Sequence, residues 1–231
     1  MDALPLIGEA VSTFDDLGER QLATVARINL AVEQFVAGDP GASATTLRRA
    51  LDDMRRSGDL TRVNTPLNNL GLALLALGEV EEAEAALLAA RPASVDGWER
   101  AAVANNLSAC LRRLGRLEEA EAALADAEAY EKASGDPSVP GRLALTRLGA
   151  SEGASNDDRL GLIRTAANVF LATLDLRGLA VTLGFARRDP LSGELRGIRG
   201  ELEAAIAGIY SGDVSFLCGL DHFPWAIVLF E

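Results

Sequence analysis

The chain has 231 residues and a formal net charge of −12; 48% of its residues are hydrophobic and only 5% are aromatic. This preference for Ala and Leu favours helices, because β-branched and aromatic residues are the ones that suit strands. The acidic balance excludes nucleic acid as an expected direct partner, since the chain as a whole would repel phosphate backbones.

Targeting and membrane signals are missing from the sequence. The first five residues contain no basic side chain and acidic residues follow soon after, which is unlike a secretory leader. No uncharged apolar run approaches the roughly 20 residues that a membrane helix needs. The two cysteines, Cys110 and Cys218, are too few for a disulfide framework. We therefore expect a cytoplasmic protein without a membrane partner.

The first predicted element is a helix over residues 4–16, so we assign residues 1–19 to an N-terminal capping helix. A helical hairpin is predicted to follow from residue 20. Its first helix contains Asn29, which matches an asparagine in each of the two later copies described next, and Gly38 marks its turn. Leu47 then belongs to the second helix of the same hairpin.

Two segments in the middle of the chain are copies of each other. Residues 67–90 align without a gap on residues 104–127, at an offset of 37, and 14 of the 24 positions are identical. In the first copy an apolar stripe of leucines starts at Leu70 with helical spacing. Gly78 is predicted to end this helix, because glycine adopts the left-handed conformation readily. Each copy therefore predicts a helix, a tight turn and a second helix.

The same spacing continues more weakly downstream. Degenerate first helices are expected at residues 145–153 and 183–193, and second helices at about 156–174 and 194–210. The predicted repeat array thus occupies residues 20–212. Residues 213–231 form a separate hydrophobic segment.

The best copies carry a recurring set of residues, namely Leu67, Leu70, Gly71, Leu74, Gly78, Ala83, Leu87 and Ala90. This pattern resembles the tetratricopeptide repeat, and its longer period is similar to that of tandem repeats in bacterial regulators. The resemblance implies an all-α, right-handed superhelical solenoid of about five helical hairpins. It also implies a concave face, lined by the first helix of each hairpin, that binds a peptide or protein segment.

No catalytic constellation is present in the sequence. The only histidine, His222, leaves no material for a histidine-based triad or a multi-histidine metal site. The only lysine, Lys132, has no glycine-rich phosphate loop before it. We therefore expect no enzymatic activity, no cofactor and no metal site.

The first helices offer candidate binding residues. Asn105, Ala109 and Arg112 share one helix face, and this face differs from the leucine stripe. Asparagine presents a donor and an acceptor together, which suits a peptide main chain, and arginine suits carboxylates. The predicted partner-binding residues are Asn68, Asn69, Asn105, Asn106, Arg112, Arg113, Arg147 and Arg188. Alternatively, the asparagines bond neighbouring backbone between packed helices and the arginines are solvated.

The C-terminal segment gathers aromatic side chains that the rest of the chain lacks. Phe216, Phe223, Trp225 and Phe230 lie in this segment, and such an apolar stretch needs to be buried. It either caps the last hairpin, docks into a neighbouring molecule, or occupies the chain's own groove. A homodimer formed through this segment is therefore possible.

Three functional hypotheses follow from the sequence. The first is a protein–protein interaction scaffold that binds an extended segment in its concave groove. The second is a ligand- or peptide-responsive regulatory domain of a bacterial signalling or transcription system. The third is a homo-oligomerisation module that uses the C-terminal segment.

Overall fold

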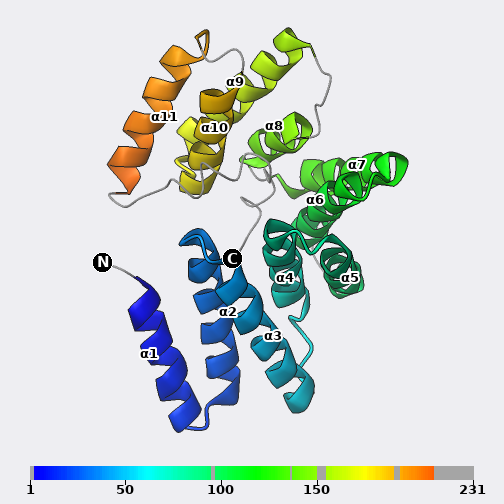
Figure 1. The fold of residues 1–231 in the computed structure, drawn as a ribbon, viewed down its shortest axis with the longest axis vertical. Helices are drawn as coiled ribbons and strands as arrows, with labels where there is room; N and C mark the ends of the chain where they lie inside the picture. Colours follow the sequence, from blue (N-terminus) through cyan, green and yellow to red (C-terminus); the bar gives the residue numbers. More distant parts are fainter. Residues whose placement is uncertain (1–2, 95–96, 136, 150–154, 190–192, 211–231) are drawn as a thin grey trace. The chain divides into compact units, whose positions relative to one another are not determined.

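The computed structural model describes residues 3–94, 97–135, 137–149, 155–189 and 193–210 (Figure 1). Over these residues it contains eleven α-helices and one short 3₁₀ turn, with no strand, so the predicted all-α class is confirmed. The chain divides into two compact units, the first covering residues 1–127 and the second beginning at residue 128. No helix in the described ranges is long and apolar enough to cross a membrane.

The first unit consists of consecutive helices that pack as neighbours along the chain. These are α1 (Ala3–Asp16), α2 (Arg20–Val36), α3 (Pro40–Ser57), α4 (Asn64–Leu77), α5 (Val80–Ala90), α6 (Gly97–Arg113) and α7 (Leu117–Ser134), with the 3₁₀ turn Arg91–Ala93 after α5. Helix α1 packs on α2, and the pairs α2–α3 and α4–α5 form hairpins. Helix α7 begins in this unit and ends beyond its boundary.

Tight turns inside these hairpins depend on glycine. At Gly78 the backbone has φ 81°, a left-handed conformation that glycine adopts without strain. Its N–H donates to the carbonyl oxygen of Leu75 at 3.1 Å, and the next N–H, from Glu79, donates to Leu74 at 2.9 Å. These bonds satisfy carbonyls at the end of α4 that have no partner within the helix. The predicted turn at this position is confirmed.

The two helices of a hairpin approach closely through small residues. Gly71 of α4 faces Leu87 of α5, and a Cβ atom added at Gly71 would lie 2.6 Å from Leu87 Cγ. Leu87 is fully buried there, as is Ala83 one turn earlier. The glycine of the repeat pattern is therefore needed because a side chain would displace the leucine that fills the hairpin interior.

The second unit contains two further hairpins. Its helices are α8 (Val139–Gly149), α9 (Asn156–Thr173), α10 (Leu176–Arg188) and α11 (Arg196–Ile209). Helix α9 packs against both α8 and α10, and α10 packs against α11. Phe170 and Ile163 of α9 and Leu183 of α10 are fully buried in its core. Hairpins thus continue to the end of the described chain, as the weak repeat signal predicts.

The first helices of this unit start earlier than the sequence spacing predicts. Helix α8 occupies Val139–Gly149 instead of 145–153, and α10 occupies Leu176–Arg188 instead of 183–193. Local start signals explain the difference. A proline, Pro140, lies in the first turn of α8, where its missing N–H is not needed. Asp175 accepts the N–H of Gly178 at 3.1 Å and so caps the start of α10.

Candidate functional site

The predicted asparagines of the first unit lie on α4 and α6, and two of them are bonded to each other. Asn106 Nδ2 donates to Asn68 Oδ1 at 2.7 Å, and both side chains are buried. In the repeat alignment Asn106 is equivalent to Asn69, whereas Asn68 is equivalent to Asn105. The bond therefore joins non-equivalent positions of consecutive copies and fixes α6 against α4.

The remaining asparagine groups have unused bonding capacity. Asn105 is only 1% exposed, and within the described structure neither its Nδ2 nor its Oδ1 atom has a hydrogen-bond partner. The Nδ2 atom of Asn69 is also buried without a hydrogen-bond partner in the described structure. For Asn69 the sequence explains this, because the position equivalent to Asn68 in the preceding hairpin is Ile28, which offers no acceptor. Nothing comparable explains Asn105.

Helix α6 is covered on more sides than its leucine pattern predicts. Residues 101–111 are all buried, including Asn105 and Ala109 on the face predicted to line a groove. Only near its C-terminal end does the helix become accessible, where Arg112 is partly exposed and Arg113 is exposed. Burial therefore does not distinguish the expected groove face from the leucine face.

The predicted arginines each have different surroundings. Arg112 forms an ion pair with Glu121 of α7, and Arg113 Nη1 donates to the carbonyl oxygen of Leu75 at 2.8 Å. Although Arg113 as a residue is exposed, partial desolvation of its guanidinium, which bonds Leu75 of α4, lowers its pKa. In the second unit Arg147 Nε donates to Glu128 at 2.9 Å.

Some of the predicted site residues are beyond what the structure describes. Arg188 is the last residue of α10, but its side chain is outside the described part. The aromatic residues of the tail, Phe216, Phe223, Trp225 and Phe230, also lie outside the described residues. A role in partner binding or capping remains a prediction for all of these positions.

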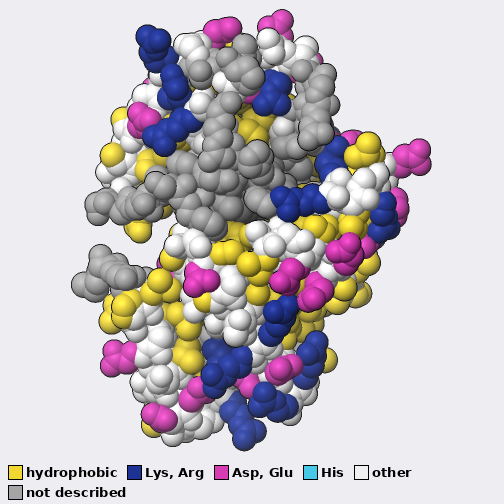
Figure 2. Space-filling view, viewed as in Figure 1, with side chains coloured by type: hydrophobic (Ala, Val, Ile, Leu, Met, Phe, Trp, Pro, Cys, Tyr) yellow, Lys and Arg dark blue, Asp and Glu magenta, His cyan; other side chains and the backbone are white. Residues whose placement is uncertain are grey.

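A cavity of about 660 Å³ lies elsewhere in the first unit. It is formed by the end of α1, the first half of α2, the end of α3 and the chain that leads into α4. Cavities of this volume are typical of ligand sites, which span roughly 300–1,000 Å³. Figure 2 shows basic side chains gathered on the surface near the start of α2 and the end of α3. Five arginines line the cavity: Arg20, Arg27, Arg49, Arg56 and Arg62.

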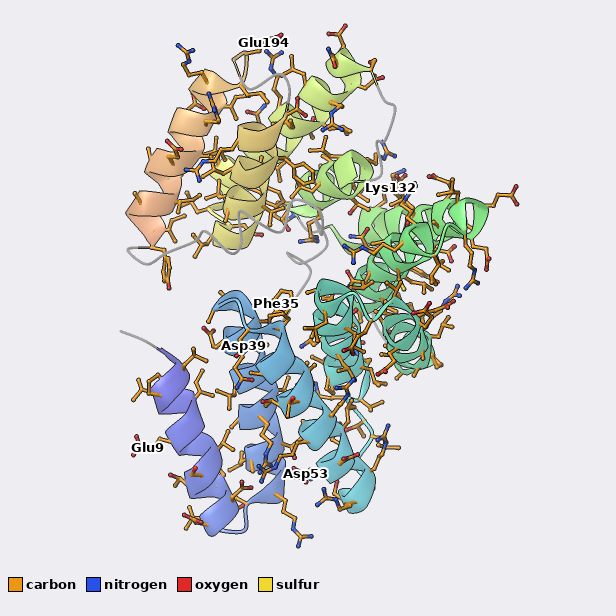
Figure 3. All side chains as sticks on the ribbon, viewed as in Figure 1. Glu9, Phe35, Asp39, Asp53, Lys132 and Glu194 are labelled. Atoms are coloured by element: carbon orange, nitrogen blue, oxygen red, sulfur yellow. The ribbon has the colours of Figure 1, made fainter. Side chains whose placement is uncertain are left out.

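Arg27 is held in the wall of this cavity by two carboxylates. It is buried, and it forms ion pairs with Asp15 of α1 and, at 2.8 Å, with Asp53 of α3. Asp53 is labelled in Figure 3, on α3. The network joins three helices. It also gives the buried guanidinium of Arg27 the opposite charges without which its burial would be unfavourable. The Nε atom of Arg27, however, has no partner within the described structure.

Sequence reasoning does not identify this cavity. Its lining comes from four segments, and none of them has a motif of its own. The spacing of Asp15, Arg27 and Asp53, which are 12 and 26 residues apart, becomes meaningful only when the three helices are packed. The one available signal is the density of arginines among residues 20–62 of an acidic chain.

Comparison with known proteins identifies the class. The tetratricopeptide repeat model matches residues 24–49 and 65–89, which fall on the hairpins α2–α3 and α4–α5. These two hairpins are tetratricopeptide repeats, as the sequence pattern predicts. Repeats of this kind form a non-catalytic scaffold and generally mediate protein–protein interaction. No curated protein matches the chain.

Proposed function

We propose that the chain is a protein-interaction module that binds an extended segment of a partner protein along α4 and α6. The observation that supports this is Asn105, a buried amide with neither its donor nor its acceptor used within the described structure. Leaving such a group unpaired costs about 1–3 kcal/mol. A peptide main chain supplies an N–H and a C=O side by side, so it would satisfy both atoms at once.

Burial of Asn105 has a kinetic consequence for this proposal. A side chain that is 1% exposed can meet a peptide only after the neighbouring side chains separate. Protein pairs typically associate with rate constants of roughly 10⁵–10⁷ M⁻¹s⁻¹, and association that needs such a rearrangement is slower. We therefore expect slow association and slow dissociation, and not a fast, weak encounter.

The experiment begins with short random peptides displayed as a library and selected on the full chain. Selected peptides are synthesised with a fluorescent label, and their dissociation constants are measured by anisotropy. Asn105→Ala should weaken binding roughly tenfold, which corresponds to one or two hydrogen bonds. A single N-methyl group, moved along the peptide, should weaken binding at the position that contacts Asn105.

Asn168→Ala is the matched control, because Asn168 is an exposed asparagine on α9 in the other unit. It should leave the affinity of the same peptides unchanged. Equal binding by both variants, or indifference to every N-methyl position, would show that Asn105 does not contact a main chain.

A further inference from the structure

The arginine-lined cavity of α1–α4 carries a local charge opposite to that of the chain. Five arginines and the three aspartates Asp15, Asp53 and Asp59 line it, so the lining has an excess of two positive charges. The whole chain has a net charge of −12. A cavity of opposite sign within an acidic protein attracts anionic groups, while the surrounding surface repels them.

The carboxylates in this lining are already engaged. Asp15 pairs with Arg27 and lies 3.6 Å from Arg49, and Asp53 pairs with Arg27 and lies 3.4 Å from Arg56. Asp59 accepts hydrogen bonds from Thr61, which lower its pKa and keep it ionised. Asp15 and Asp53 are therefore engaged by arginines of the lining, whereas Asp59 is bonded, within the described structure, only by the uncharged donors of Thr61 and Gln21.

Two lining arginines remain without an acidic partner. Among the residues that the structure describes, the guanidinium groups of Arg20 and Arg62 make no ion pair and no hydrogen bond. Arg20 is the first residue of α2, and Arg62 lies in the connection between α3 and α4. Arg20 and Arg62 are therefore the lining cations that no carboxylate of the described residues engages.

The cavity lining also includes apolar side chains, and two exposed leucines are close to it in sequence. Val25 and Met54 line its interior, and Val25 is 55% exposed. Leu17 and Leu60, each next in sequence to a lining residue, are exposed as well. A small free acid would use only the interior, whereas an extended segment would cover these leucines too.

We propose that this cavity binds a protein segment in which carboxylate side chains alternate with apolar ones. Arg20 and Arg62 pair with the carboxylates, while the apolar side chains pack on Val25, Leu17 and Leu60. Arg27 acts as a positioning residue, because it holds α1 and α3 against α2 and so maintains the cavity between them. This second site goes beyond the function proposed above, since it does not involve Asn105.

The test uses the displayed random-peptide library on the full chain and on two double variants. Arg20→Gln with Arg62→Gln removes the two unpaired cations. Arg164→Gln with Arg196→Gln is the matched control, because both of these arginines are exposed and outside the cavity, and the change in net charge is the same. We expect acidic and apolar residues to be enriched among peptides selected on the parent chain. The affinity of these peptides should fall roughly tenfold or more in the Arg20→Gln, Arg62→Gln variant and stay within about twofold of the parent in the control.

Each other outcome overturns the inference. No acidic enrichment, or equal loss of affinity in both double variants, would mean that the cavity does not select carboxylates. Displacement of the peptides by glutarate at an equal concentration would assign the cavity to a small acid. Peptides that depend on Asn105 but not on Arg20 and Arg62 would remove this site and leave the proposed function intact. Circular dichroism of each variant confirms that it is folded.

Discussion

Asn105 and Asn106 are neighbours in α6, and the Oδ1 atom of each has no partner within the described structure, but only Asn106 uses its Nδ2 donor. Asn106 donates to Asn68 at 2.7 Å across the interface between α4 and α6. Asn105 is equally buried but makes no hydrogen bond within the described structure. Removing the first amide leaves a buried acceptor unpaired, whereas removing the second takes away a group that already lacks partners.

Replacement of each asparagine by alanine should therefore have different effects on stability. We expect Asn106→Ala to lower the free energy of unfolding by about 1–3 kcal/mol, because the oxygen of Asn68 loses its donor inside the protein. Asn105→Ala should leave stability unchanged or raise it. Urea titration followed by circular dichroism measures both. If Asn105→Ala is as destabilising as Asn106→Ala, its amide has a structural partner and our interpretation of this residue is wrong.

A second single residue, Cys110, should make the stability of the fold depend on pH. Its thiol is buried and donates to the carbonyl oxygen of Val80 at 3.3 Å. Burial, and secondly the negative charge of Glu84, raise the pKa of Cys110 from 9.0 to about 12. Between these two values the unfolded chain releases the thiol proton while the folded chain keeps it. The thiol's contribution to stability is therefore complete below pH 9 and is lost as the pH rises toward 12.

Comparison with Cys110→Ala isolates this contribution. At about pH 10 the parent should have lost roughly 1 kcal/mol relative to its own value at neutral pH, beyond any loss in the variant. Urea unfolding at a series of pH values measures the difference. Parallel curves for the two proteins would mean that the folded and unfolded thiols titrate together.

At the scale of elements, neighbouring helices approach closely where one of them lacks a side chain. Gly178 of α10 faces the ring of Phe170 in α9, and a Cβ atom there would lie 2.3 Å from Cδ1. Phe170 is fully buried, so its ring has no space to move into. Gly161 of α9, by contrast, has no atom within 4 Å of the corresponding position.

Alanine at these two glycines should shift stability in opposite directions. Gly178→Ala is expected to destabilise by about 1–3 kcal/mol, because α10 and α9 must separate to admit the methyl group. Gly161→Ala should stabilise by about 0.5–1 kcal/mol, since it adds helix propensity at an open position. Thermal unfolding of both variants provides the comparison. A tolerated Gly178→Ala would mean that the packing of α10 on α9 is looser than described.

Hairpins are also the elements that the sequence predicts best, because their signals are local. Gly78 and the leucines that start at Leu70 specify a helix and its end within a few residues. Helix α8 begins six residues before its expected start because counting from the repeat period takes no account of Pro140. The cavity is not predictable in this way, since Arg27 acquires its role only through Asp15 and Asp53 on other helices.

The same limit applies to the buried asparagines. Spacing predicts that Asn105 lies on a different face from the leucines of α6, but it does not tell whether that face is covered. Coverage depends on every element packed around the helix. The structure buries both faces, and this information is absent from the periodicity of a single helix.

At the scale of the whole molecule, the chain separates into two compact units near residue 127. Helix α7, Leu117–Ser134, crosses this boundary, and its residues Ala120, Ala123 and Leu124 are buried in the first unit. In repeat proteins stability comes mainly from contacts between neighbouring units, so part of an array can fold alone.

A fragment that ends after α7, at residue 134, should therefore fold by itself. We expect helical circular dichroism and a cooperative urea transition. The shorter fragment 1–127 should be less stable, because it cuts α7 before its last turns and exposes the helix end to fraying. A broad, non-cooperative transition for both fragments would show that the boundary between the compact units is not a boundary for folding.

The bond between Asn106 and Asn68 has a consequence for how such a chain grows. Because it joins the second asparagine of one copy to the first asparagine of the copy before, the Asn-Asn dipeptide is complementary to itself one repeat away. Duplication of a unit that contains the dipeptide would create a junction whose buried amides already match. The preceding hairpin has Ile28 followed by Asn29, so the series stops there. Duplication of a repeat that contains the Asn-Asn dipeptide is thus compatible with this core, whereas duplication of the hairpin that contains Ile28 is not.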